Sequence, residues 1–181
     1  GGRGRGIIVG GRNHPVTFAD IDMIEIGTAG NATDFGDLAL PNSAASGGAS
    51  STTRAIIAGG YEQPAAAINS RLQYIILSSS GGANDFGDLT EGALTALGMT
   101  SNNTRGLLYG GNDPNYIADI FQFNLQSLGE ESDFGSVFEN EPIRNVAIVT
   151  SPTRALFAGG QNAAGYPGTI AFREIASGGI V

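Results

Sequence analysis

The sequence has 181 residues, 29 of them glycine, and a net charge of −8. It contains no cysteine and one histidine, and its nine basic residues are all arginine. These counts exclude a disulfide framework, a cysteine-based zinc site and a catalytic lysine, and the negative charge argues against nonspecific binding to nucleic acid. The apolar runs are far shorter than the roughly 20 residues of a membrane-spanning helix.

A seven-residue pattern returns four times along the chain, with a period of about 50 residues. Each copy has an arginine, a small residue, a short apolar run and a glycine pair. The copies occupy residues 5–11, 54–60, 105–111 and 154–160. We call two sets of residues in this pattern the anchor arginines and the glycine pairs. They are Arg5, Arg54, Arg105 and Arg154, and Gly10, Gly11, Gly59, Gly60, Gly110, Gly111, Gly159 and Gly160.

Two further markers follow the same period. An Asp-Phe-Gly element stands at 34–38, 85–89 and, in a weaker form, 133–137. Alternating apolar runs occupy 21–26, 72–77, 120–125 and 170–175. Because three markers keep one phase, we expect residues 1–181 to form a single repeat domain.

The residues of each repeat favour strands. Short runs of Ile, Leu, Val, Phe and Tyr, bounded by Gly and Asn, are typical of strands. In the third repeat, strands are predicted at 105–111 and, after the loop 112–115, at 116–126. The Asp-Phe-Gly element predicts a turn leading into a short strand. A last strand, such as 145–150, passes through a Ser/Thr-rich turn into the next arginine. The fold class is therefore all-β.

Four strands in about 50 residues make a propeller blade. The apolar strand closed by a glycine pair resembles the kelch repeat. The tryptophan usual in kelch blades is absent, and Phe35, Phe86 and Phe134 occupy its neighbourhood. The resemblance implies a kelch-like β-propeller of about four blades.

Three stretches have a more specific resemblance. Residues 30–38, 51–61 and 81–90 resemble repeats of tailed-phage virion proteins, particularly the tail-fibre-like and appendage proteins of cyanophages. The resemblance covers all four repeats. It implies a nonenzymatic structural protein on the virion surface, such as a fibre, appendage or capsid-decoration subunit. The implied partners are copies of itself, other virion proteins and a host surface glycan or receptor.

The repeats do not fill a closed ring. Four full repeats need about 200 residues, whereas the first repeat lacks the strand before Arg5 and the fourth lacks its Asp-Phe-Gly element. Three explanations remain open: a closing blade short of strands, a strand supplied by a neighbouring chain, or a fragment of a longer array. We expect closure to be completed by a partner chain, because an open blade edge exposes unpaired backbone groups.

The anchor arginines and glycine pairs favour architecture over ligand binding, because one site would not recur four times. A phosphate cradle needs a helix N-terminus after the glycines, and the sequence predicts none. We expect each glycine pair to end a buried strand. We expect each arginine to form an ion pair with the acidic Asp-Phe-Gly turn of its own or an adjacent blade, rather than to clamp a ligand.

The acidic elements offer one metal hypothesis. Asp34, Asp37, Asp85 and Asp88 could ligate Ca²⁺ together with carbonyl groups and water, but aspartate is also a common turn residue. We expect turn structure, with calcium as the alternative and no other cofactor.

The loops after the glycine pairs differ in length and sequence, and Tyr61, Tyr116 and Tyr166 lie in or beside them. Tyrosine is a good contact residue, so the alternative function is binding of a carbohydrate or host receptor through these loops.

No catalytic constellation emerges. His14 lies in a loop, and no serine stands in a nucleophile-elbow pattern. The glutamates at 130, 131, 139 and 141 cluster in one divergent repeat and suit a solvated acidic face better than a pair of catalytic carboxylates. We therefore expect no enzymatic activity.

Overall fold

The structure is a computed structural model that describes residues 4–43, 47–62, 66–112, 115–137 and 142–176. Within these ranges every regular element is a β-strand, which confirms the predicted all-β class. The described residues include no helix long and apolar enough to span a membrane.

Four antiparallel sheets follow one another along the chain, and each is a meander in sequence order. The first sheet contains β1 (Arg5–Val9), β4 (Asp20–Glu25) and β5 (Thr33–Asp37). The second contains β6 (Gly47–Ser50), β7 (Arg54–Ala58), β10 (Arg71–Ile76) and β11 (Asn84–Asp88). The third contains β12 (Gly98–Ser101), β13 (Arg105–Tyr109), β14 (Asp119–Asn124) and β15 (Ser132–Ser136). The fourth contains β16 (Ala147–Thr150), β17 (Arg154–Ala158) and β18 (Ile170–Glu174).

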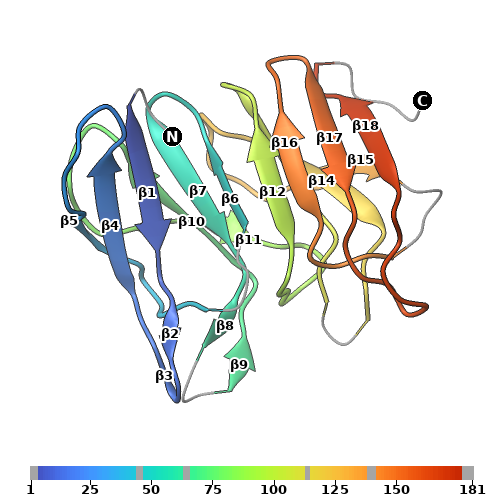
Figure 1. The fold of residues 1–181 in the computed structure, drawn as a ribbon, viewed down its shortest axis with the longest axis horizontal. Helices are drawn as coiled ribbons and strands as arrows, with labels where there is room; N and C mark the ends of the chain where they lie inside the picture. Colours follow the sequence, from blue (N-terminus) through green and yellow to red (C-terminus); the bar gives the residue numbers. More distant parts are fainter. Residues whose placement is uncertain (1–3, 44–46, 63–65, 113–114, 138–141, 177–181) are drawn as a thin grey trace.

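Two small hairpins extend from the first two sheets. They are β2 (Arg12–Asn13) with β3 (Val16–Thr17), and β8 (Tyr61–Glu62) with β9 (Ala67–Ile68). Each hairpin follows a glycine pair, and both extend below the sheets in the view of Figure 1. These two hairpins thus lie beyond the strand ends opposite the Ser/Thr-rich turns that precede the anchor arginines.

The Asp-Phe-Gly element is a strand with a bulge. In the first sheet the register shifts between Ile21 and Asp22, opposite the element. Gly36 takes a φ of +143°, and its N–H donates to Oδ1 of Asp34 at 2.9 Å. The second and third sheets have the same register shift. The expected short strand is confirmed, and the aspartate stabilises a bulge within the strand rather than a turn before it.

The sheets stack face to face, and three separate apolar clusters join them. One cluster lies between the first and second sheets and includes Ile21 and Ile75. The next lies between the second and third sheets and includes Ile56 and Leu108. The last lies between the third and fourth sheets and includes Phe157. None of these three clusters joins the fourth sheet to the first.

The described residues form an open row rather than a closed ring. The first sheet lies at one end of the long axis and the fourth at the other (Figure 1). In this part of the chain the first sheet has no strand equivalent to β6, and the fourth has no strand equivalent to β15. The two strands are therefore absent where the sequence predicted. Within the described residues the sheets do not close into a propeller, because the first and fourth sheets do not meet.

Candidate functional site

The anchor arginines join neighbouring sheets. Three of them donate from Nη1 to the backbone carbonyl of the residue that directly follows β10, β14 or β18 in the next sheet. The bonds run from Arg5 to Leu77 (2.8 Å), from Arg54 to Leu125 (3.2 Å) and from Arg105 to Ile175 (2.5 Å). Charge-assisted hydrogen bonds of this kind are stronger than neutral ones. Three guanidinium groups also lie over aromatic rings of their own sheet: Arg54 over Tyr74, Arg105 over Phe134 and Arg154 over Phe172.

The predicted ion pair with the acidic turn was wrong. Arg5 pairs with Glu25 at 2.9 Å, and Arg154 pairs with Glu174 at 2.9 Å. Each glutamate lies directly opposite its arginine on the paired strand of the same sheet, β4 for Glu25 and β18 for Glu174. That register position, not the Asp-Phe-Gly element on the neighbouring strand, faces the guanidinium.

The glycine pairs contact the segment that leads into the next sheet. The second glycine of three pairs donates its N–H to a carbonyl in that segment. The acceptors are Asn42 for Gly11 (2.9 Å), Leu94 for Gly60 (2.9 Å) and Ile143 for Gly111 (3.3 Å). The first glycine of each of these pairs has a positive φ, and a Cβ there would collide with the same carbonyl. These contacts agree with the interpretation that the pairs serve packing. At Gly159, by contrast, a Cβ would meet nothing within 4 Å.

A hydroxyl ladder runs across β6, β12 and β16. Each is the first strand of its sheet, and we call them the inner strands because those of neighbouring sheets contact one another. Ser101 Oγ donates to the carbonyl of Ser50 at 2.8 Å, and Thr150 Oγ1 donates to the carbonyl of Ser101 at 3.1 Å. Thr100 Oγ1 also donates to Thr150 Oγ1 at 3.0 Å. A polar groove of about 410 Å³ lies here, lined mainly by Ser, Thr and Asn of the turns before the anchor arginines. The Ser/Thr content of these turns was its only signal in the sequence, and it indicated a turn rather than a groove.

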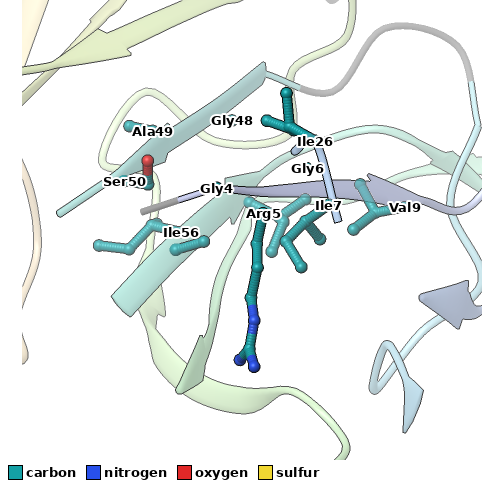
Figure 2. Close-up of a pocket in the computed structure, with 12 residues that line it drawn as sticks. Gly4, Arg5, Gly6, Ile7, Val9, Ile26, Gly48, Ala49, Ser50 and Ile56 are labelled. Carbon is teal, nitrogen blue, oxygen red and sulfur yellow. The ribbon is translucent and has the colours of Figure 1, made fainter. Parts of the chain in front are cut away.

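A second cavity, also of about 410 Å³, opens beside β1 and is lined by residues of β1, β6 and β7 together with Gly4 and Ile26 (Figure 2). In the other three sheets the strand equivalent to β1 pairs with an inner strand, and the inner strands of neighbouring sheets contact one another. Among the described residues β1 pairs with β4 alone. This cavity, which we call the strand slot, therefore lies where an inner strand of the first sheet would run.

The three loop tyrosines do not share one environment. Tyr61 is half-buried in β8, where its carbonyl accepts a hydrogen bond from Ser43 Oγ. Tyr116 is half-buried with the guanidinium of Arg144 over its ring at 5.2 Å. Tyr166 is 82% exposed. Of the three, Tyr166 is the one whose ring is free to contact a ligand from solvent.

The four aspartates of the calcium hypothesis lie exposed on β5 and β11. Asp34 accepts the N–H of Gly36, and Asp88 Oδ1 accepts the hydroxyl of Ser70 at 3.1 Å. In the described part of the chain, no three His, Cys, Asp or Glu side chains come together as a metal site. The calcium hypothesis stays a prediction.

The remaining acidic and basic candidates are dispersed. His14 is exposed in the β2–β3 hairpin. Glu131 is buried and accepts hydrogen bonds from the N–H (2.5 Å) and hydroxyl (2.9 Å) of Thr90, so it links the second and third sheets. This buried role differs from the solvated acidic face expected for Glu131. Residues 139 and 141 lie outside the described residues.

No protein-family model matches the chain, and no curated protein matches it at a significant level.

Proposed function

We propose that the protein is a nonenzymatic structural protein of a tailed-phage virion, a fibre, appendage or decoration subunit built from propeller-type blades. One observation carries the proposal: the residues that recur in each repeat are used to join sheets. Three anchor arginines bridge to the next sheet and three glycine pairs receive the segment that leads into it. A scaffold whose recurring residues join one sheet to the next is suited to a mechanical rather than a catalytic role.

The propeller part of the proposal includes completion of the first blade by a partner chain. The strand slot is bordered by an uncompleted strand edge, β1, and by the inner strand β6. An extended segment of a neighbouring virion protein would pair with β1 there by strand addition. Such a contact would couple the closing of the blade to assembly of the particle.

Immunogold labelling of purified phage particles tests the virion assignment. Antibodies raised against the 181-residue chain are expected to label intact particles at one structural location, because a structural subunit remains bound after purification. Particles lacking both the gold label and the protein by mass spectrometry, while lysates of infected cells contain the protein, would contradict the proposal.

Exposure of Tyr166 favours a second candidate function, recognition of a host glycan or receptor. The loop 161–168 carries this ring at 82% exposure, and exposed tyrosines on a rigid scaffold are effective contact residues. The phage-particle proposal and this one are compatible, because a fibre or appendage is where host contact is made.

Tyr166→Ala is expected to abolish binding on a glycan array or to intact host cells while changing the free energy of unfolding by less than about 0.5 kcal/mol. Leu128→Ala, at an exposed residue of the β14–β15 connection, is the matched control and is expected to leave binding unchanged. Undiminished binding by the Tyr166 variant would rule out this loop as the recognition surface.

A further inference from the structure

Each sheet has two distinct faces, defined by what they pack against. The forward face packs on the next sheet along the chain, and the rear face packs on the preceding one. In the second sheet the forward face carries Ile56 and Leu72, which join the cluster shared with the third sheet. The rear face carries Ile57 and Ile75, which join the cluster shared with the first sheet. Forward-to-rear contact is thus the only kind of sheet junction these three clusters contain.

The forward face of the fourth sheet has the residues of such a junction, but no sheet of the described residues packs against it. Ile170 is 71% exposed, whereas its equivalents Ile21, Leu72 and Ile120 are fully buried. Leu156 and Phe172 on the same face are also exposed. Arg154 and Gly159 occupy the positions at which other repeats reach the next sheet. The guanidinium of Arg154 instead bonds Glu174 of its own sheet, and a Cβ at Gly159 would meet open space.

The rear face of the first sheet has the residues of the opposite side of such a junction, and it is also uncovered by any sheet of the described residues. Ile26 is 68% exposed, whereas the exposure of its equivalents Leu77, Leu125 and Ile175 is 3% or less. Those three residues supply the carbonyls that accept from the anchor arginines of the preceding sheet. Ile8 on this face is also exposed, although Ile57, at the same position of the second sheet, is buried.

We propose that these two end faces bind each other between copies of the chain, so that the fourth sheet of one copy packs forward-to-rear on the first sheet of the next. The occupant is a second copy because the two faces are the two halves of a junction that this chain builds three times internally. They lie at opposite ends of the row (Figure 1) and so do not meet within one molecule.

The docked geometry follows from the internal junctions. Ile170 and Leu156 pack against Ile8 and Ile26 of the next copy, and Arg154 donates to the carbonyl of Ile26, as Arg105 does to Ile175. The contact is heterologous, so it closes into a ring where the rotation between copies permits and extends into a filament where it does not. This inference goes beyond the virion assignment, because it rests on the repeats alone and predicts which surface joins the copies.

Analytical ultracentrifugation of the full chain, with one aspartate variant on each face, tests the proposal. The unchanged chain is expected to associate with rising concentration. Ile26→Asp and Ile170→Asp are each expected to be monomeric, because each places a charge in one half of the apolar contact. Both side chains are exposed in the single chain, so both variants are expected to keep the circular dichroism spectrum of the unchanged protein.

Mixing the two variants provides the decisive result. Each variant keeps one intact face, so an equimolar mixture is expected to form a 1:1 dimer and nothing larger. Leu128→Asp, on neither face, is the matched control and should associate like the unchanged chain.

Two results would overturn the proposal: a chain that stays monomeric at about 1 mM, or variants whose mixture gives no heterodimer. A monomeric chain would leave the virion proposal standing, and unlabelled phage particles would leave the end-face proposal standing. The two failures are therefore distinguishable.

Discussion

Phe157→Ala is expected to lower the free energy of unfolding by about 3–5 kcal/mol. Phe157 is fully buried on the rear face of the fourth sheet, in the cluster shared with the third sheet. Its ring lies edge-on to Tyr109, with centroids 5.4 Å apart and planes at 78°. Truncation removes this contact and leaves a cavity at the junction. Urea unfolding followed by far-ultraviolet circular dichroism measures the loss, since the chain has no tryptophan to report by fluorescence.

Phe172→Ala is the matched control, because it makes the same change on the forward face of the same sheet. Phe172 is 48% exposed, so we expect a loss below about 1 kcal/mol in dilute solution, where the end faces are unoccupied. Equal losses for the two variants would contradict the assignment of one covered and one uncovered face. At high concentration the effect of Phe172→Ala is expected to grow as the forward face becomes covered.

The repeat made much of the fold predictable. The strand alternation and the phase of three markers located the strands to within a few residues, because apolar periodicity and glycine punctuation are local signals. The predicted strand at 145–150 is β16 (Ala147–Thr150). Among the described residues, the first and last sheets lack a strand at the places that the missing markers predicted. Whether the sheets close into a ring could not be predicted, because the rotation between sheets depends on packing that no single repeat encodes.

The partners of the anchor arginines could not be predicted from the sequence. Arg105 donates to the carbonyl of Ile175, a residue of the next repeat whose side chain carries no sign of the bond. A charged side chain predicts a partner of opposite charge, whereas every residue has a main-chain carbonyl, so the sequence does not indicate which carbonyl accepts. The hydroxyl ladder has the same character, because Ser101 and Thr150 also donate to main-chain carbonyls.

The burial and contacts of the loop tyrosines could not be predicted from the sequence either. Position after a glycine pair placed Tyr116 and Tyr166 in comparable loops, yet one lies under Arg144 and the other is exposed. The difference arises because Arg144 leads into the fourth sheet and bonds Gln161 Oε1 through Nε and Nη2. In the described part of the chain no further sheet follows the fourth. The loop of Tyr166 therefore has no equivalent cover.

Gly59→Ala is expected to cost about 2–5 kcal/mol, because two separate penalties add at this position. Gly59 has a φ of +59°, a conformation that costs an alanine roughly 1–2 kcal/mol. The added Cβ would also collide with the carbonyl of Leu94. That carbonyl accepts the N–H of Gly60 at 2.9 Å. Moving it away breaks a junction hydrogen bond, which costs about 1–3 kcal/mol more.

Gly159→Ala separates these two costs. Gly159 has nearly the same φ, +63°. Its N–H donates to the carbonyl of Thr169, just as the N–H of Gly59 donates to the carbonyl of Arg71. A Cβ at Gly159 meets nothing within 4 Å, so only the conformational cost of roughly 1–2 kcal/mol is expected in dilute solution. Urea unfolding of both variants measures the difference. Equal losses would mean that the glycine pair is required only for its backbone conformation. A larger loss at Gly59 would show that the first glycine is required by the approach of the segment leading into the next sheet.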